Sequence, residues 1–211
     1  MIFDLDDTLI ETSKCLTPYY LRSCFSAMQG AGSAGSLDDL IQLNEKALTL
    51  TAALEEFCGG KKEIYQAGLS ALNQPLPKNI SIDLLPGALE VLDELQAVHT
   101  LALVTKGNPQ FQRLKMEKAG IQPERFSKLV IGNGPSKKSD YQMVLSDLKI
   151  DPSEALVCGD RVSVDLSPAK ELGMFTVHIR NGRGEFHDGP MEHVDFAIND
   201  LKQLYEVFEI A

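Results

Sequence analysis

Hydrophobic and polar positions follow two alternating patterns along the chain from residue 84 onward. Short runs rich in Val, Ile and Leu are each followed by a stretch in which apolar residues recur at helical spacing. This alternation is typical of βαβ units around a parallel sheet. The predicted strands are residues 101–104, 129–131, 155–158, 175–179 and 195–198, with a sixth at 2–3. The predicted helices are residues 88–97, 111–119, 141–148 and 166–172.

These elements predict an α/β fold with a doubly wound, Rossmann-like parallel sheet. Right-handed crossovers place helices on both faces of such a sheet, and ligands bind beyond the carboxyl ends of its strands. Only three apolar residues precede the acidic positions 4–7, so we expect a short first strand. This abrupt start also leads us to expect that the natural chain begins upstream of Met1.

A long segment near the N-terminus interrupts this pattern and contains no convincing strand. Amphipathic stretches cover residues 18–28, 37–57 and 63–72, and the glycine-rich segments 30–36 and 59–62 separate them. We therefore predict a core domain of residues 1–11 and 84–211, and an α-helical domain of residues 12–83 inserted into it.

Composition indicates which partners and which cellular compartment to expect. The 211 residues carry 20 Lys and Arg against 30 Asp and Glu, a net charge of −10, and such a field repels nucleic acid. No apolar run reaches the length of a membrane span and no secretory signal is present, so we expect no membrane partner and a cytoplasmic location. The 4 Cys lack metal or redox spacing and are expected to be buried, reduced thiols. The sequence does not predict the oligomeric state.

Chemically useful side chains follow four of the predicted strands. Asp4 and Asp6 follow the first strand and fall on the same side of an extended segment, which suits a hard cation and acid/base chemistry; a solvated acidic turn is the alternative. Thr105 and Lys106 follow the second strand, where a hydroxyl and backbone N–H groups before a helix can hold an anion.

The other two strands add a cation and further carboxylates. The loop after residues 129–131 leads to Lys137 and Lys138, of which either can neutralise a carboxylate or a phosphoryl oxygen; both being solvated is the alternative. The fourth strand ends in Gly159, which allows close backbone approach, followed by Asp160 and Asp165. Four such groups in this order, each at a strand's carboxyl end, favour a phosphate-transfer site.

The D-x-D-x-T pattern at residues 4–8 and the G-D-x-x-x-x-D pattern at 159–165 resemble the haloacid dehalogenase-like hydrolase superfamily. The resemblance covers residues 1–11 and about 84–204, all of the predicted core. It implies a Mg²⁺-dependent phosphatase that acts on a small phosphorylated metabolite through an aspartyl-phosphate. It also implies that the helical insertion is a cap that excludes water and selects the leaving group.

The resemblance also implies roles for single residues. Asp4 matches the nucleophile and Asp6 the acid/base, whereas Asp7 matches no required position and is expected to be a solvated or capping carboxylate. Thr8 matches the residue that fixes the loop beside the substrate. Substrate phosphoryl binding is assigned to the Thr105 hydroxyl and the Lys106 backbone N–H.

The lysine and the metal ligands complete the expected site. Lys137 is the preferred match to the family's charge-neutralising lysine, with Lys138 the alternative, because the loop departs from the common K-P-x-P pattern. Mg²⁺ is expected to bind Asp4, Asp160 and the backbone carbonyl of Asp6, and Asp165 is expected to orient Lys137 or a metal-bound water.

Competing functions remain open at this level. A phosphomutase shares all of these residues, and a non-enzymatic phosphate-binding or scaffold protein is the alternative from another class. A dehalogenase is disfavoured, since such members lack a carboxylate at the position of Asp6. The four histidines lie away from the predicted site and are expected to be ordinary core or surface residues, and the segment 181–184 is expected to be a simple turn. The polar residues of the insertion that are candidates for substrate contact, without naming a substrate, are Lys14, Arg22, Lys61 and Lys62.

Overall fold

The protein divides into two compact units. The structure is a computed structural model that describes residues 1–47, 49–134, 136–185 and 191–210. One unit comprises Met1–Thr12 and Ser81–Ala211, and the other comprises Ser13–Ile80. We call the first the core unit and the second the helical unit, and each is described by itself.

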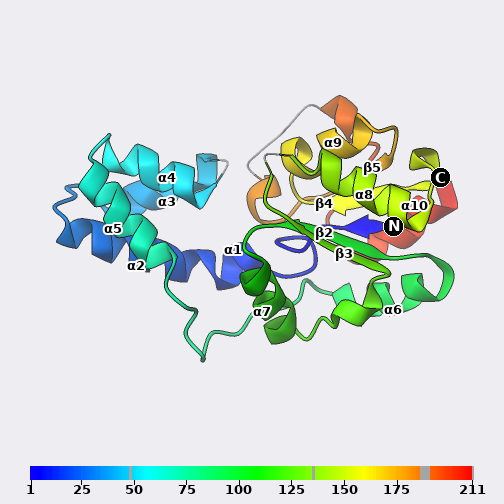
Figure 1. Ribbon diagram of the computed structural model, residues 1–211, viewed down its shortest axis with the longest axis horizontal. Helices are drawn as coiled ribbons and strands as arrows, with labels where there is room; N and C mark the ends of the chain where they lie inside the picture. The colour runs from blue at the N-terminus through cyan, green and yellow to red at the C-terminus, as the bar shows by residue number, and fades with distance from the viewer. Residues whose placement is uncertain (48, 135, 186–190, 211) are drawn as a thin grey trace. The chain divides into compact units, whose positions relative to one another are not determined.

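The core unit is built on a six-stranded parallel sheet with the strand order β3-β2-β1-β4-β5-β6 (Figure 1). The strands are β1 (Ile2–Phe3), β2 (Ala102–Lys106), β3 (Lys128–Gly132), β4 (Leu156–Gly159), β5 (Phe175–Ile179) and β6 (Phe196–Ile198). The prediction of a doubly wound parallel sheet with a short first strand is therefore confirmed. The strand order reverses between the two central strands, β1 and β4, the position where such folds bind ligands.

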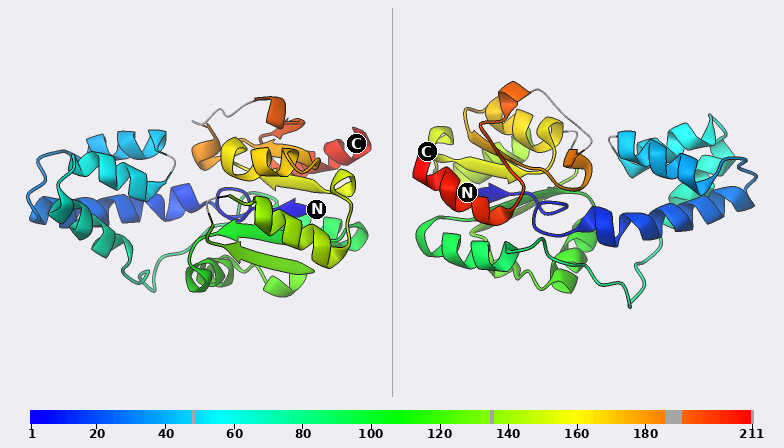
Figure 2. Two further views of the ribbon diagram at one scale, coloured as in Figure 1. Left: turned by 45° about the horizontal axis from the view of Figure 1, so that its top comes forward. Right: turned by 180° about the vertical axis from the view of Figure 1, so that it is seen from behind.

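Helices cover both faces of the sheet. The helices α6 (Ala88–Val98) and α7 (Pro109–Ala119) lie on one face, and α8 (Lys138–Leu148) and α9 (Ser167–Lys170) lie on the other (Figure 2). The helix expected at residues 166–172 begins earlier, as a π-helical segment η3 (Val162–Leu166) that continues into α9. The final helix α10 (Leu204–Ile210) was not predicted.

Apolar side chains from the strands and helices form the core under α8 and α9. Ile2, Val104 and Val157 point from the sheet toward Tyr141 and Leu166, and these five residues are at most 3% exposed. Phe3 and Leu103 alternate to the opposite face and are also fully buried. Because every central strand is apolar on both faces, the polar groups of the core unit are concentrated where the strands end.

The helical unit contains helices only, within the residues that are described. They are α2 (Thr17–Gly30), α3 (Leu37–Lys46), α4 (Leu50–Cys58) and α5 (Lys62–Leu72), preceded by the short helix α1 (Thr12–Cys15), whose first residue belongs to the core unit. The amphipathic stretch at residues 37–57 forms two helices, because Thr49 adopts an extended conformation and caps a new helix by accepting a hydrogen bond from Ala52 N–H (3.1 Å). The helices α2 to α5 each contribute an apolar face to a shared cluster around Met28, Leu40 and Leu54.

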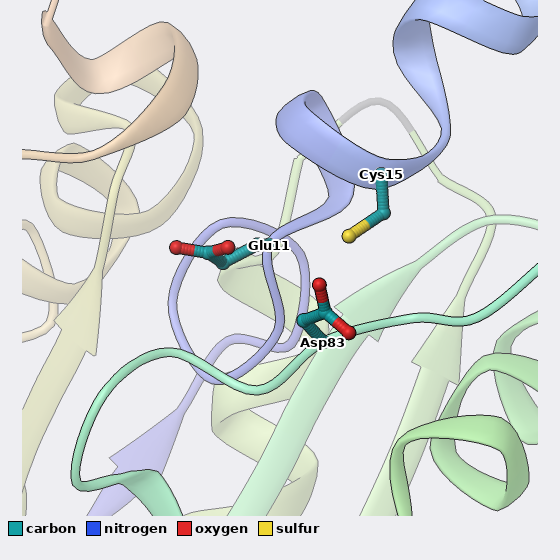
Figure 3. Close-up of side chains that lie close together, drawn as sticks. All are labelled: Glu11, Cys15 and Asp83. Carbon is teal, nitrogen blue, oxygen red and sulfur yellow. The ribbon is translucent and has the colours of Figure 1, made fainter.

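The two chain segments that connect the units lie side by side where they leave the core unit. The Glu11 N–H donates to the Asp83 carbonyl (2.8 Å), and Ile10 and Leu84 form an isolated antiparallel bridge. Figure 3 shows the Glu11 and Asp83 side chains on these two segments. None of the described helices is both long and apolar enough to cross a membrane. The four cysteines, all within the described residues, form no disulfide bond, and Cys15 is half-buried rather than buried as expected.

Candidate active site

The carboxyl ends of β2, β1 and β4 bring the predicted polar residues to one edge of the sheet. Phe3 pairs with Leu103 and with Cys158, so the residues that follow these three neighbouring strands are adjacent. The Asp4 N–H extends the ladder by donating to the Cys158 carbonyl (3.0 Å). Asp4 and Asp160 are both buried there, at 7% and 2% exposure.

Lys137 connects the carboxylates at this edge. Its Nζ lies 2.5 Å from an Asp4 oxygen and 2.6 Å from an Asp165 oxygen, and the residue is 1% exposed. The neighbouring Lys138 points the other way and pairs with Glu171 at 2.7 Å, with both side chains exposed. The geometry thus places Lys137, and not Lys138, at the candidate site.

The buried carboxylates repel one another. Burial, together with the charges of Asp165 and Asp6, outweighs the attraction of Lys137 and raises the pKa of Asp4 to about 7. Burial and the carboxylates of Asp165 and Asp4 raise the pKa of Asp160 well above its usual range. Burial disfavours the charged Lys137, but Asp165 and Asp4 more than offset it, so the pKa of Lys137 is also raised well above its ordinary value.

This charge imbalance fits a divalent cation. Oxygen atoms of Asp4, Asp160 and Asp165 lie within 4.8 Å of one another, and all three residues are buried. Burial first, and then the neighbouring carboxylates, raise the pKa values of Asp4 and Asp160 although Lys137 and Arg161 act in the opposite direction. An all-oxygen, anionic set of this kind suits Mg²⁺. The Asp6 side chain is not part of this set, and a contribution from its backbone carbonyl stays a prediction.

Asp6 faces a different group of donors. Its Oδ1 accepts hydrogen bonds from the Thr12 hydroxyl and from Lys115 Nζ, the latter at 2.6 Å, and its Oδ2 accepts from Gln112 Nε2 at 2.8 Å. Burial opposes the charge on Asp6, but Lys115 and the hydrogen bonds from Lys115, Thr12 and Gln112 dominate. They hold the pKa of Asp6 below its usual value.

The residues expected to bind the phosphoryl group line the end of β2. Thr105 is fully buried, and its hydroxyl oxygen accepts from Gln112 Nε2 at 2.7 Å. The Lys106 ammonium donates a hydrogen bond to the Gly134 carbonyl. The backbone N–H of Lys106 is therefore the group considered for phosphoryl binding. Thr8 is fully buried, and its hydroxyl has no hydrogen-bond partner among the described residues, so its position favours packing of the loop.

The conformation of the loop after β4 explains why the G-D-x-x-x-x-D pattern begins with a glycine, Gly159. A Cβ on Gly159 would lie 2.6 Å from the Cβ of Asp165, so the close approach expected at this glycine is made by that side chain. The Asp165 Oδ2 accepts from the Arg161 N–H (2.9 Å), and Tyr141 donates to the Asp165 carbonyl (3.1 Å). These contacts fix Asp165 in the π-helical turn η3, an irregularity that is common at functional sites.

Two expectations about residues near the site are wrong. Asp7 is not solvated: it is 6% exposed, has a positive φ of 57°, and lies where a Cβ on Gly182 would meet it. His178 is not away from the site, because its Nε2 lies 2.8 Å from the Asp160 carbonyl. The segment 181–184 therefore does more than turn the chain, since Asn181 Nδ2 also donates to the Asp7 carbonyl (3.1 Å).

Gln112 and Lys115 are the site residues that sequence reasoning missed. Both lie on the buried face of α7, together with Met116 and Ala119. Polar residues at core-facing positions of an amphipathic helix are the signal that marks them, because a buried Lys requires a partner. The helix alone does not reveal that the partner is Asp6.

Comparison with known proteins identifies the class. The family model of the haloacid dehalogenase-like hydrolases matches residues 1–179. The chain belongs to this family. The predicted family, fold and hydrolase class are therefore confirmed.

The matching relatives and solved structures include phosphatases that are named for different substrates. A glyceraldehyde 3-phosphate phosphatase of Methanocaldococcus jannaschii is 26% identical, with 98% of this chain and 95% of that protein aligned. A phosphoserine phosphatase of Thermus thermophilus is 30% identical over 50% of this chain and 43% of that protein. A predicted phosphoglycolate phosphatase from Haemophilus somnus has the same fold, with a TM-score of 0.74, 19% identity and coverage of 98% of this chain and 96% of that one.

Proposed function

We propose that the protein is a Mg²⁺-dependent phosphatase that hydrolyses small phosphomonoesters through a phosphorylated Asp4. The observation that carries this proposal is the buried Lys137 bridging Asp4 and Asp165 beside Asp160, at the carboxyl edge of the sheet. This arrangement supports the proposal because it brings together a carboxylate suited to attack phosphorus, a buried ammonium group and a cluster of carboxylates suited to a divalent metal. The phosphatases among the relatives support the same reaction class.

Each residue of the site has a chemical task in this reaction. An Asp4 oxygen attacks phosphorus and forms an acyl phosphate, while the bond from phosphorus to the leaving oxygen breaks and that oxygen takes a proton from Asp6. Asp6 then takes a proton from the water that attacks phosphorus, which releases phosphate and restores Asp4. Lys137 offsets negative charge on Asp4 and on the transferring phosphoryl group, and the Thr105 hydroxyl and the Lys106 N–H hold that group.

The metal would be held by Asp4 and Asp160, with Asp165 orienting the ligands around it. Bound Mg²⁺ supplies positive charge that brings the phosphate dianion to a carboxylate nucleophile and stabilises the transferring phosphoryl group. The contact of 2.8 Å between His178 Nε2 and the Asp160 carbonyl oxygen would fix the backbone of this metal ligand.

The proposed substrate is a class of compounds and not a single metabolite. We take small phosphorylated metabolites as the class, with glyceraldehyde 3-phosphate and phosphoserine as the first compounds to test because relatives act on them by name. Residues 13–80 are proposed to act as the cap that selects the leaving group.

Phosphate release from a panel of phosphorylated metabolites, measured with Mg²⁺ and with excess chelator, tests the proposal. We expect release from at least one small phosphomonoester with Mg²⁺ and a return to the uncatalysed rate in chelator. A phosphomutase would instead move phosphate between positions of a sugar with little release. Binding of phosphorylated ligands without turnover of any of them would indicate a non-enzymatic phosphate-binding protein.

A further inference from the structure

A buried lysine on α7 makes an ion pair that the proposed reaction scheme does not use. The Lys115 side chain is 7% exposed, its Nζ lies 2.6 Å from Asp6 Oδ1, and it stands 4.9 Å from the centre of the Phe111 ring. Burial of an ammonium group is costly unless it is paired, and Met116 beside it shows that α7 accepts a fully buried apolar residue. The position of Lys115 is thus explained by its contact with Asp6.

The donors around Asp6 are distributed unequally between its two oxygens. Among the described residues, Oδ1 accepts from both Thr12 and Lys115, and Oδ2 accepts from Gln112 only. A carboxylate oxygen accepts about two hydrogen bonds, so Oδ1 is saturated by these residues and Oδ2 keeps one position open.

Gln112 connects Asp6 to the end of β2. The same Nε2 that reaches Asp6 Oδ2 lies 2.7 Å from the Thr105 hydroxyl oxygen and 2.9 Å from the Lys106 carbonyl. Since the Thr105 oxygen accepts this contact, its own proton remains available for a phosphoryl oxygen. One amide therefore fixes the distance between the group that would hold the phosphoryl and the group that would protonate the leaving oxygen.

We propose that Lys115 and Gln112 are positioning residues that hold Asp6 so that its Oδ2, and not Oδ1, exchanges the proton with the leaving group and with water. In the first half-reaction the bond from phosphorus to the leaving oxygen breaks and that oxygen receives the proton from Oδ2. In the second, Oδ2 takes a proton from the attacking water. This inference rests on the proposed function and assigns residues of α7 to leaving-group protonation.

The dependence of rate on leaving group tests this assignment. Phenolate leaves poorly without a proton, whereas p-nitrophenolate leaves without one, and the two substrates carry the same phosphoryl group. General acid catalysis contributes about 10²-fold or more, so we expect Lys115→Met to lower kcat/KM for phenyl phosphate by about 10²-fold and for p-nitrophenyl phosphate by less than about fivefold. Arg113→Met, an exposed cation on the same helix, is the matched control and should leave both values unchanged.

Two further variants keep the test decisive. Lys115→Arg retains a cationic donor and should recover part of the loss with phenyl phosphate. Thr12→Val removes the other Oδ1 donor at nearly constant volume, so it carries the test if Lys115→Met does not fold, with the same selective loss at smaller size.

The outcomes separate this inference from the proposed function. Equal losses with both substrates, or no loss with either, would overturn the positioning role while the wild-type activity stands. If the wild-type protein cleaves neither substrate nor any member of the metabolite panel with Mg²⁺, the proposed function itself fails.

Discussion

The core unit and the helical unit both bury apolar side chains, but they differ in the polar side chains that they bury. The buried polar and charged residues of the core unit include Asp4, Lys115, Lys137 and Asp165, whereas in the described part of the helical unit Asn44 alone is of this kind. The helical unit buries an apolar cluster around Leu54 instead. The core unit carries unfavourable electrostatic interactions that a reaction can use, whereas the helical unit is held together mainly by apolar packing.

The largest effect should come from the nucleophile of the core unit. Asp4→Asn removes the attacking oxygen, so turnover with Mg²⁺ should fall by at least about 10³-fold, while the melting temperature in chelator should not fall. Phosphate release and thermal unfolding of the same preparation measure both. Turnover near the wild-type value in this variant is incompatible with a phosphorylated Asp4.

The reverse pattern is expected in the helical unit. Leu54→Ala removes a fully buried side chain from the apolar cluster and should lower the free energy of unfolding by about 2–5 kcal/mol. Urea denaturation followed by circular dichroism measures this, and the exposed Glu55→Ala on the same helix should change it by less than about 0.5 kcal/mol. Similar values for the two variants would show that α4 does not pack through Leu54.

The two adjacent lysines provide a comparison within the core unit. Lys137→Ala removes the ammonium that contacts Asp4 and Asp165 and should lower turnover by about 10²-fold or more. Lys138→Ala removes only an exposed pair with Glu171, and turnover should change by less than about threefold. Steady-state kinetics with one substrate are sufficient, and a reversed ranking would contradict the placement of Lys137.

Metal removal should reveal how far the ionisation of Asp4 destabilises the folded core unit. The pKa of Asp4 is raised to about 7 from 3.8, so between these values the folded protein keeps a proton that the unfolded chain has lost. The contribution of Asp4 to stability therefore decreases as pH rises through this range. In chelator, the melting temperature of Asp4→Asn relative to wild type should increase from pH 5 to pH 8.

Added Mg²⁺ provides the control for that experiment. The metal binds the folded state, so it should raise the melting temperature of the wild-type protein at pH 8 more than that of Asp4→Asn. A difference between the two proteins that is the same at pH 5 and pH 8 would show that Asp4 is not destabilised in the metal-free site.

The smallest effect is expected at Asp7. Asn adopts a positive φ readily and has the shape of Asp, so Asp7→Asn should change turnover by less than about threefold. Asp7→Val should be destabilised by about 1–3 kcal/mol, because a β-branched residue is strained at φ 57°. Kinetics and thermal unfolding of both variants separate charge from backbone conformation, and a large kinetic loss in Asp7→Asn would assign the carboxylate a role.

Local patterns in the sequence were sufficient to predict the elements of the fold. Period-2 and period-3.6 hydrophobicity depend only on near neighbours, and they located all six strands and the helices α6, α7 and α8. The same reasoning did not locate the boundary between α3 and α4 within the amphipathic stretch 37–57, because the cap at Thr49 depends on one backbone conformation that hydrophobic spacing does not encode. The positions of Asp4, Asp160 and Thr105 followed from the rule that parallel strands end at one edge.

Only the tertiary structure decided which of these side chains meet. Lys115 and Asp6 are 109 residues apart, and neither the spacing around Asp6 nor that within α7 encodes the pair. The same holds for the burial of Asp7 against Gly182, the contact of His178 with Asp160, and the choice of Lys137 over Lys138. The sequence by itself determined which faces are apolar and which strand ends carry polar groups, whereas partners across the sheet depend on helix rotation and loop conformation, which are set by packing of the whole core.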